Sequence, residues 1–161
     1  MKIRLAAPVT RDSIVDGPGL RMVIWTQGCP HRCKGCHNPQ THSYDGGFEV
    51  DVEDIVEQMK QLKLHKGITI SGGEPLEQGE ACSIIAKEAK KMGLDVWIYT
   101  GYIFEDICER AKADKPEWAE LLKWVDVLVD GPFIEEQKNM LLRFRGSENQ
   151  RIIDLREKDI F

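Results

Sequence analysis

Residues 21–39 read RMVIWTQGCPHRCKGCHNP. The first seven letters are mostly apolar and β-branched, which predicts a buried strand over residues 21–27. The residues that follow include three cysteines, Cys29, Cys33 and Cys36, with three residues between the first pair and two between the second. A loop this tight can gather its thiols around a single metal centre. We therefore expect a strand that ends in a metal-binding loop.

Further apolar runs lie downstream of this strand, each short and bounded by Gly or Pro. They predict strands over residues 67–71, 94–100 and 125–130. Helical patterns alternate with the strands, over residues 51–62, 78–92, 104–113 and 116–123. Strands that alternate with helices imply parallel βαβ units with right-handed crossovers.

The length limits how many such units the fold contains. At 161 residues, the chain has room for about four or five βα units, fewer than the eight of a complete barrel of roughly 250 residues. No repeat, low-complexity tract or charge block in the sequence marks a second domain. We therefore expect one domain over residues 1–161, of the α/β class: an open, partial (β/α) barrel, truncated and with a mostly parallel sheet.

Composition narrows the class of partner. The formal net charge of −5 argues against a nucleic-acid binder, which needs basic residues to neutralise phosphates. No segment approaches the ~20 apolar residues of a membrane helix, and the first apolar run is too short for a secretory signal. Five cysteines, three of them within eight residues, fit a metal site in a reducing compartment better than a disulfide framework. We expect a cytoplasmic protein that binds neither nucleic acid nor membrane.

Each predicted strand is followed by an unusual loop. In parallel α/β folds, sites are built from the loops at the carboxyl ends of the strands, so these loops should converge on one rim. Besides the cysteine loop, they are residues 71–75, 100–102 and 130–132. In the first of them, Gly72 and Gly73 allow close backbone approach, and Glu74 adds an acceptor for a ligand's ammonium group.

Three cysteines are one short of the four that saturate a cubane iron-sulfur cluster or a closed zinc site. An open coordination position is what a catalytic metal site needs. Cys82 and Cys108 share helical spacing with apolar neighbours, so we expect both to be small core residues rather than a fourth ligand. A zinc site with His31 or His37 as the fourth ligand is the alternative that spacing leaves open.

The cysteine loop after the first strand and the Gly-Gly-Glu-Pro sequence at residues 72–75 after the second together resemble the radical S-adenosylmethionine superfamily. The resemblance implies an α/β fold of the truncated radical S-adenosylmethionine type. It also implies a [4Fe-4S] cluster, with three irons bound by the catalytic cysteines Cys29, Cys33 and Cys36. S-adenosylmethionine would chelate the fourth iron through its amino and carboxylate groups.

The same resemblance names candidate contacts to this cofactor. Residues expected at the cofactor are Gly35, Gly72, Gly73, Glu74, Thr100 and Asp130, with Gly72 to Glu74 lining the methionine end. Gly35 departs from the superfamily pattern, because many members carry at that position an aromatic residue that packs near the adenine.

Residues 13–21, SIVDGPGLR, resemble the Asp-Gly-x-Gly-x-Arg signature of enzymes that activate glycyl radical enzymes. A surface turn is the alternative interpretation, since Asp-Gly-Pro-Gly forms turns unaided. In that family the segment is implicated in meeting the glycine loop of the partner. The resemblance therefore makes partner-recognition candidates of Asp16, Gly17, Gly19 and Arg21.

Further stretches at residues 99–102, 127–133 and 143–151 resemble the activases that serve anaerobic ribonucleoside-triphosphate reductase. This implies an oxidoreductase: an electron donor such as flavodoxin or ferredoxin reduces the cluster, S-adenosylmethionine is cleaved, and the 5′-deoxyadenosyl radical takes hydrogen from a glycine of the reductase. Alternatives are an activase of another glycyl radical enzyme, a small-molecule radical enzyme such as a deazapurine carboxylate synthase, and a non-catalytic metal-binding module.

Overall fold

The computed structural model describes residues 1–156 and 158. Four parallel strands form the centre of one sheet, in the order β3-β5-β6-β7: Arg21–Thr26, Gly67–Gly72, Asp95–Tyr99 and Val127–Asp130. Most of their residues are buried, as expected of strands that are covered on both faces. All four predicted strands are confirmed, with ends that differ by two residues or fewer.

Antiparallel strands border this parallel centre. They are β1 (Lys2–Leu5) and β4 (Phe48–Asp51) beyond β3, β8 (Arg151–Asp154) beside β7, and β2 (Thr10–Ser13), which also pairs with β3. Each has four residues and exposes charged side chains. Short charged strands are typical of sheet edges, and their apolar pattern is too brief to predict them. The sheet is thus mixed around the expected parallel centre.

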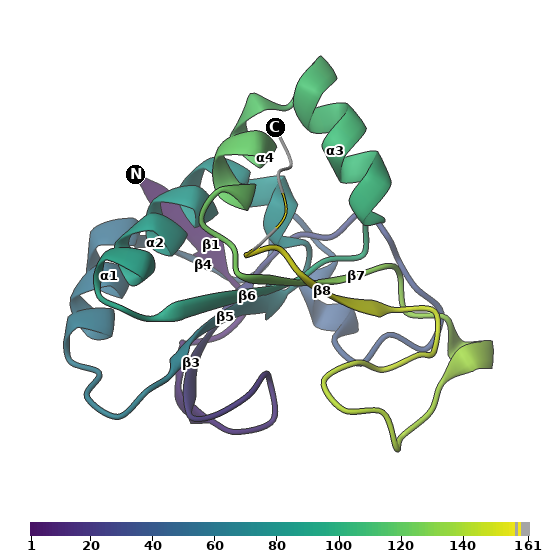
Figure 1. The fold of residues 1–161 in the computed structure, drawn as a ribbon. Coiled ribbons are helices and arrows are strands. Elements are labelled where there is room, and N and C mark those ends of the chain that lie inside the picture. Colours follow the sequence, from purple (N-terminus) through teal and green to yellow (C-terminus); the bar gives the residue numbers. More distant parts are fainter. Residues whose placement is uncertain (157, 159–161) are drawn as a thin grey trace.

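The helices lie on one face of the sheet (Figure 1). They are α1 (Val52–Lys60), α2 (Gly79–Lys91), α3 (Phe104–Ala113) and α4 (Pro116–Leu122), with short 3-10 turns at Pro39–Thr41, Pro75–Gln78 and Glu135–Gln137. All four helices were predicted. In α2, Cys82, Ile85 and Ala89 share one helix face and are buried in the core together with Ile70 and Ile98 of the sheet.

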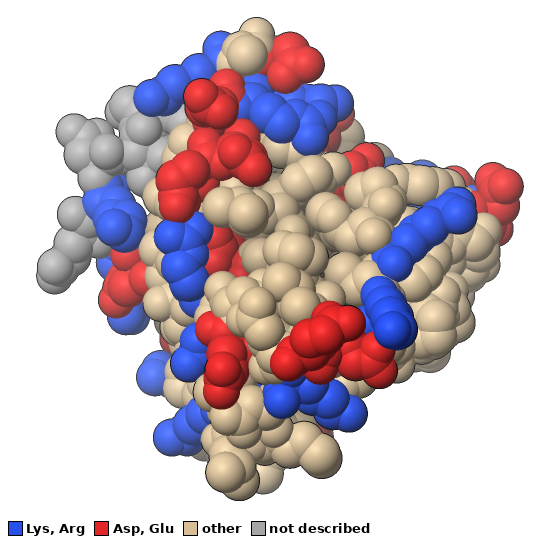
Figure 2. Space-filling view, turned by 90° about the vertical axis from the view of Figure 1, so that its right-hand side faces the viewer, with Lys and Arg blue, Asp and Glu red and all other residues tan. Residues whose placement is uncertain are grey.

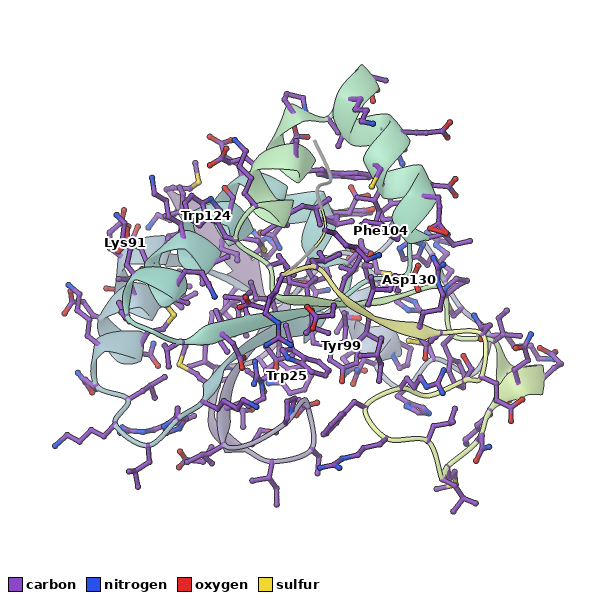
Figure 3. The ribbon with its side chains drawn as sticks, viewed as in Figure 1. Trp25, Lys91, Tyr99, Phe104, Trp124 and Asp130 are labelled. Atoms are coloured by element: carbon purple, nitrogen blue, oxygen red, sulfur yellow. The ribbon has the colours of Figure 1, made fainter. Side chains whose placement is uncertain are left out.

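Loops rather than helices cover the opposite face. The turn of residues 14–20 and the loop of residues 131–150 lie on that side of the ribbon (Figure 1). A second, small apolar cluster forms around Trp97, against Tyr99 and Phe144. Figure 3 labels Tyr99 on this lower side of the sheet. The candidate site lies on the loop-covered side.

Charges of both signs are interspersed on the surface. Figure 2 shows Lys and Arg alternating with Asp and Glu around a region free of both, and neither sign forms a continuous stripe on the face in view. Within the part of the chain that the structure describes, no helix has the length and apolar character needed to cross a bilayer.

Candidate functional site

A cavity of about 420 Å³ opens at the carboxyl ends of the parallel strands. Its volume falls within the range of small-molecule sites, about 300 to 1,000 Å³. All four rim loops contribute to its lining, which confirms their predicted convergence. They contribute Cys29, His31, Cys33 and Cys36 after β3, Ser71, Gly72 and Gly73 at the end of β5, Thr100 and Gly101 after β6, and Gly131 and Phe133 after β7.

The three cysteines of the loop after β3 are free, half-buried thiols that line this cavity together. Backbone hydrogen bonds hold the base of the loop. Gly28 N donates to Thr41 O at 2.7 Å, and Cys29 N donates to His42 O at 3.1 Å. Burial raises the pKa of the Cys29 thiol to about 11. This sulfur therefore remains protonated until a metal binds it and releases the proton.

The two histidines considered as zinc ligands have other contacts. His31 Nε2 lies 2.6 Å from Glu74 Oε1, and the ring of His37 lies against Phe133 with 5.1 Å between the ring centroids. Among the described residues, no three Cys, His, Asp or Glu side chains lie close enough together to hold one metal ion. As they stand, the side chains are therefore not gathered around a single ion.

Gly72 and Gly73 bring the end of β5 against the base of the cysteine loop. A Cβ atom on Gly72 would lie 2.5 Å from Thr26 N, and one on Gly73 would lie 2.5 Å from Gly28 O. Gly73 N donates to Thr26 O at 2.7 Å, and Glu74 N donates to Gly28 O at 2.8 Å. Any larger residue would push the two loops apart and break these hydrogen bonds.

The Glu74 side chain is completely buried and lies behind the cavity wall. Its carboxylate accepts from His31 Nε2 at 2.6 Å, Gly101 N at 2.8 Å, Leu76 N at 3.1 Å and Thr100 Oγ1 at 2.8 Å. These donors come from the loops after β3, β5 and β6. One carboxylate thus joins three neighbouring loops, and the side chain nearest to it on the cavity side is His31.

Thr100 and Asp130, both expected at the cofactor, differ in position. Thr100 lines the cavity and donates to Glu74, so it fixes that carboxylate. Asp130 is buried in an ion pair with Arg151 and accepts from Phe104 N at 2.9 Å at the start of α3, where Figure 3 labels both Asp130 and Phe104. Contrary to expectation, the Asp130 carboxylate is committed to the fold, and its neighbour Gly131 lines the cavity.

Gly35 has a left-handed backbone conformation, with φ of 74°. A Cβ atom there would also lie 3.0 Å from the carboxyl group of Glu135. An aromatic residue at this position would therefore have a strained backbone and would have to displace the Glu135 side chain. Aromatic rings reach the cavity from the loop of residues 131–150 instead, through Phe133 and Phe144.

Arg21 was expected to meet a partner, yet its side chain is completely buried. Its guanidinium donates to Thr69 Oγ1 at 2.8 Å, Ile68 O at 2.7 Å and Pro18 O at 3.0 Å, and it forms an ion pair with Asp95. A residue with this many internal partners cannot contact another protein. The expectation is wrong because the Arg21 side chain turns inward, across the first residues of β5 and β6.

Of the other residues in the signature, Asp16 reaches the cavity. Its half-buried carboxylate lines the wall and accepts from Ser13 Oγ at 2.6 Å. Gly17 makes room for Arg21, since a Cβ atom would lie 2.8 Å from the arginine side chain. Gly19 turns the chain with φ of 74°. The glycines therefore shape the turn that presents Asp16.

Sequence reasoning missed part of the lining. His42 reaches the cavity wall, where its buried Nε2 has no hydrogen-bond partner among the described residues. Phe144, Arg145 and Gln150 also contribute. They come from an irregular loop whose apolar residues follow no helix or strand periodicity. The resemblance of residues 143–151 to known activases was the one indication in the sequence that this loop is functional.

The remaining cysteines stand apart from the described cavity lining. Cys82 is buried in α2, where burial raises its pKa to about 12, as expected of an inert core thiol. Cys108 on α3 is half-buried rather than a core residue.

Residues 15–153 match the family model described as "4Fe-4S single cluster domain". The chain is similar to the anaerobic ribonucleoside-triphosphate reductase-activating protein of Vibrio cholerae, with 34% identity over 86% of this chain and 90% of the relative. The protein of that name from Escherichia coli K12 is 32% identical over 89% of this chain and 94% of its own length. The one from Enterobacteria phage T4 is 34% identical over 86% of each.

Among solved structures, the chain is similar to the crystal structure of QueE from Escherichia coli. The TM-score is 0.48 at 18% sequence identity, and the match covers 62% of this chain and 52% of QueE. The matched part is thus about half of that protein.

Proposed function

This chain belongs to the anaerobic ribonucleoside-triphosphate reductase-activating proteins and to the 4Fe-4S single cluster domain family, and from that membership we propose that it generates the glycyl radical of such a reductase. The proposal is carried by one observation: three free thiols and the Gly72-Gly73 turn line the same cavity. The reductase is the protein partner, and the reaction is a one-electron cleavage of S-adenosylmethionine.

The donor set fits a [4Fe-4S] cluster. Cys29, Cys33 and Cys36 supply three half-exposed thiols on a loop fixed at its base, which suits three irons and leaves one iron without a cysteine. The fourth iron would take S-adenosylmethionine. The unpartnered Nε2 of His42 in the same wall is a further polar atom that a bound group could satisfy.

The cluster and S-adenosylmethionine, when bound, supply the one-electron chemistry that takes the α-hydrogen from a glycine of the reductase. The electron comes from an external donor such as flavodoxin or ferredoxin. Gly72 and Gly73 would admit the methionine end of the cofactor to the sheet edge. Glu74 would provide the negative charge that pairs with the ammonium group of S-adenosylmethionine. Phe133 and Phe144 would replace the missing aromatic residue at position 35 and exclude water from the adenosine end.

The architecture suits a protein substrate. We propose that residues 1–161 act as a single radical S-adenosylmethionine unit, an open and truncated version of a (β/α) barrel. The parallel centre of four strands is half of a complete eight-stranded barrel, so one side of the cavity needs another body to shield a radical from water. The reductase would be that body. Free thiols at the site suit a reducing cytoplasm.

The test is to reconstitute the protein with iron and sulfide without oxygen, reduce it, and add S-adenosylmethionine and the reductase. We expect 5′-deoxyadenosine together with a glycyl radical signal in electron paramagnetic resonance, and neither product with Cys33→Ala. Formation of 5′-deoxyadenosine without a glycyl radical would assign the chain to another substrate. A colourless protein that holds one zinc ion would identify a metal-binding module.

A further inference from the structure

The Glu74 carboxylate already has a full set of hydrogen-bond donors. Its two oxygens offer about four acceptor positions, and four donors from within the chain reach them: the side chains of His31 and Thr100 and the backbone N–H groups of Leu76 and Gly101. The carboxylate is completely buried. An ammonium group that binds Glu74 must therefore take the place of one of these donors.

Three of the donors are held by the fold. Leu76 N and Gly101 N belong to the backbone of packed loops. Thr100 is buried, and its hydroxyl oxygen also accepts from Tyr102 N at 3.1 Å. The two backbone groups can leave Glu74 only if the loops move, and rotation of Thr100 would also cost the Tyr102 N hydrogen bond.

His31 is different, because its side chain retains 14% of its exposure, whereas Thr100 is buried. It comes from an otherwise exposed part of the cysteine loop, between Pro30 and Arg32. An ionised carboxylate only accepts, so His31 Nε2 carries the hydrogen of their 2.6 Å bond. This contact is made by a side chain alone, so a rotation about the side-chain bonds of His31 would release the acceptor position on Glu74 without moving the backbone.

We propose that His31 is a positioning residue that competes with the cofactor's ammonium group for Glu74. This inference rests on the proposed function, in which Glu74 receives that group. His31 satisfies and orients the buried carboxylate, and it moves aside when the ammonium arrives. In this exchange the ammonium group replaces the His31 imidazole as a donor to Glu74, and its permanent positive charge strengthens the hydrogen bond to the carboxylate. Binding of the cofactor must therefore break the hydrogen bond between His31 and Glu74, and its affinity is lower than it would be without His31.

The chain offers two independent ways to remove the competitor. His31→Ala deletes the donor. Gly101→Ala leaves both partners in place, but its Cβ atom would lie 2.7 Å from His31 Nε2, so the ring must move off Glu74. The Gly101 backbone lies outside the left-handed region, so alanine is opposed there by the imidazole and not by its own conformation. His31→Gln, which keeps a side-chain donor, is the matched control.

The measurement is the dissociation constant of S-adenosylmethionine for iron-loaded protein with the cluster oxidised, obtained by anaerobic equilibrium dialysis. We expect His31→Ala and Gly101→Ala each to bind about three- to tenfold more tightly than the wild type, a gain below that of a complete charged hydrogen bond. His31→Gln should stay close to the wild type. The double variant should match His31→Ala, because the added methyl group then has no imidazole to displace.

Unchanged or weaker binding by His31→Ala, with wild-type iron content and melting temperature, would overturn the competition. If that variant does not fold, the same outcome in Gly101→Ala overturns it. Failure of the proposed function looks different: Glu74→Gln would then bind the cofactor as well as the wild type does, or iron-loaded wild type would not bind it.

Discussion

Two buried charges occupy opposite ends of the same parallel strands. Arg21 is the first residue of β3 and contacts the beginnings of β5 and β6, through Ile68 and Asp95. Glu74 follows the end of β5 and contacts the loops after β3 and β6. Each side chain thus joins three neighbouring strands, one at their amino ends and one at their carboxyl ends.

The two charges differ in how they are neutralised. Arg21 has a permanent counter-ion in Asp95, and its other partners are internal carbonyl and hydroxyl oxygens. Glu74 has no Lys or Arg partner among the described residues, and one of its hydrogen-bond donors is a histidine that lines the cavity. A charge paired inside the fold serves stability, whereas a charge with a donor that can leave is suited to a ligand. The carboxyl ends of the strands are therefore the functional end.

The largest expected effect follows at that functional end. Cys29→Ala, Cys33→Ala and Cys36→Ala should each abolish the intact cluster, which holds about four irons per chain in the reconstituted wild type. The chain should still fold, because these thiols line a cavity rather than the core. Iron content, visible absorbance and circular dichroism of anaerobically reconstituted protein test this.

The remaining cysteines provide the control for these variants. Cys82→Ala and Cys108→Ala should keep the cluster. A cluster that survives the loss of Cys33 but not of Cys82 would contradict the ligand assignment.

The next effect concerns the amino ends of the strands. Arg21→Met should lower the free energy of unfolding by about 3 to 5 kcal/mol, because it leaves the partly buried Asp95 and two carbonyl groups without their donor. Adding Asp95→Asn should restore part of the loss. Glu74→Gln should cost less, about 1 to 3 kcal/mol, since it deprives a neutral donor of its acceptor. Urea unfolding of cluster-free protein measures all three.

A surface pair is the control for Arg21. Lys60→Met removes an exposed contact with Glu57 on α1 and should leave the unfolding free energy unchanged. Equal losses for Arg21→Met and Lys60→Met would remove the distinction between a buried and an exposed charge, and with it the structural role of Arg21.

Local sequence patterns were sufficient for the parallel centre and the rim. Apolar runs marked β3, β5, β6 and β7, and their order alone predicts which loops meet at the carboxyl ends. The partners of individual polar residues were not predictable in this way. Arg21 contacts Asp95 across 74 positions, and Glu74 contacts His31 across 43. Such pairings depend on how strands stack in the sheet, and no short-range spacing encodes them.

Asp130 was misassigned for the same reason. Its place at the carboxyl end of β7 resembled that of a cofactor contact, but Arg151 lies beside it on β8, a strand that the sequence pattern did not predict. Position along a strand therefore predicted which loop reaches the rim, and it did not predict which side chain of the loop faces the cavity.

The smallest expected effect on the fold comes from replacing Asp16. Arg21 holds the turn that contains Asp16 by donating to Pro18 O, and the Asp16 carboxylate lines the cavity. Asp16→Ala removes one hydrogen bond, from Ser13, so thermal stability, iron content and cofactor binding should change little. If Asp16 meets the glycine loop of the reductase, glycyl radical yield should fall at least about tenfold, the equivalent of one charged hydrogen bond. Ser13→Ala loses the same internal bond but keeps the carboxylate, so it should retain the radical yield. An equal loss of glycyl radical yield in both variants would show that Asp16 serves only the structure of the turn.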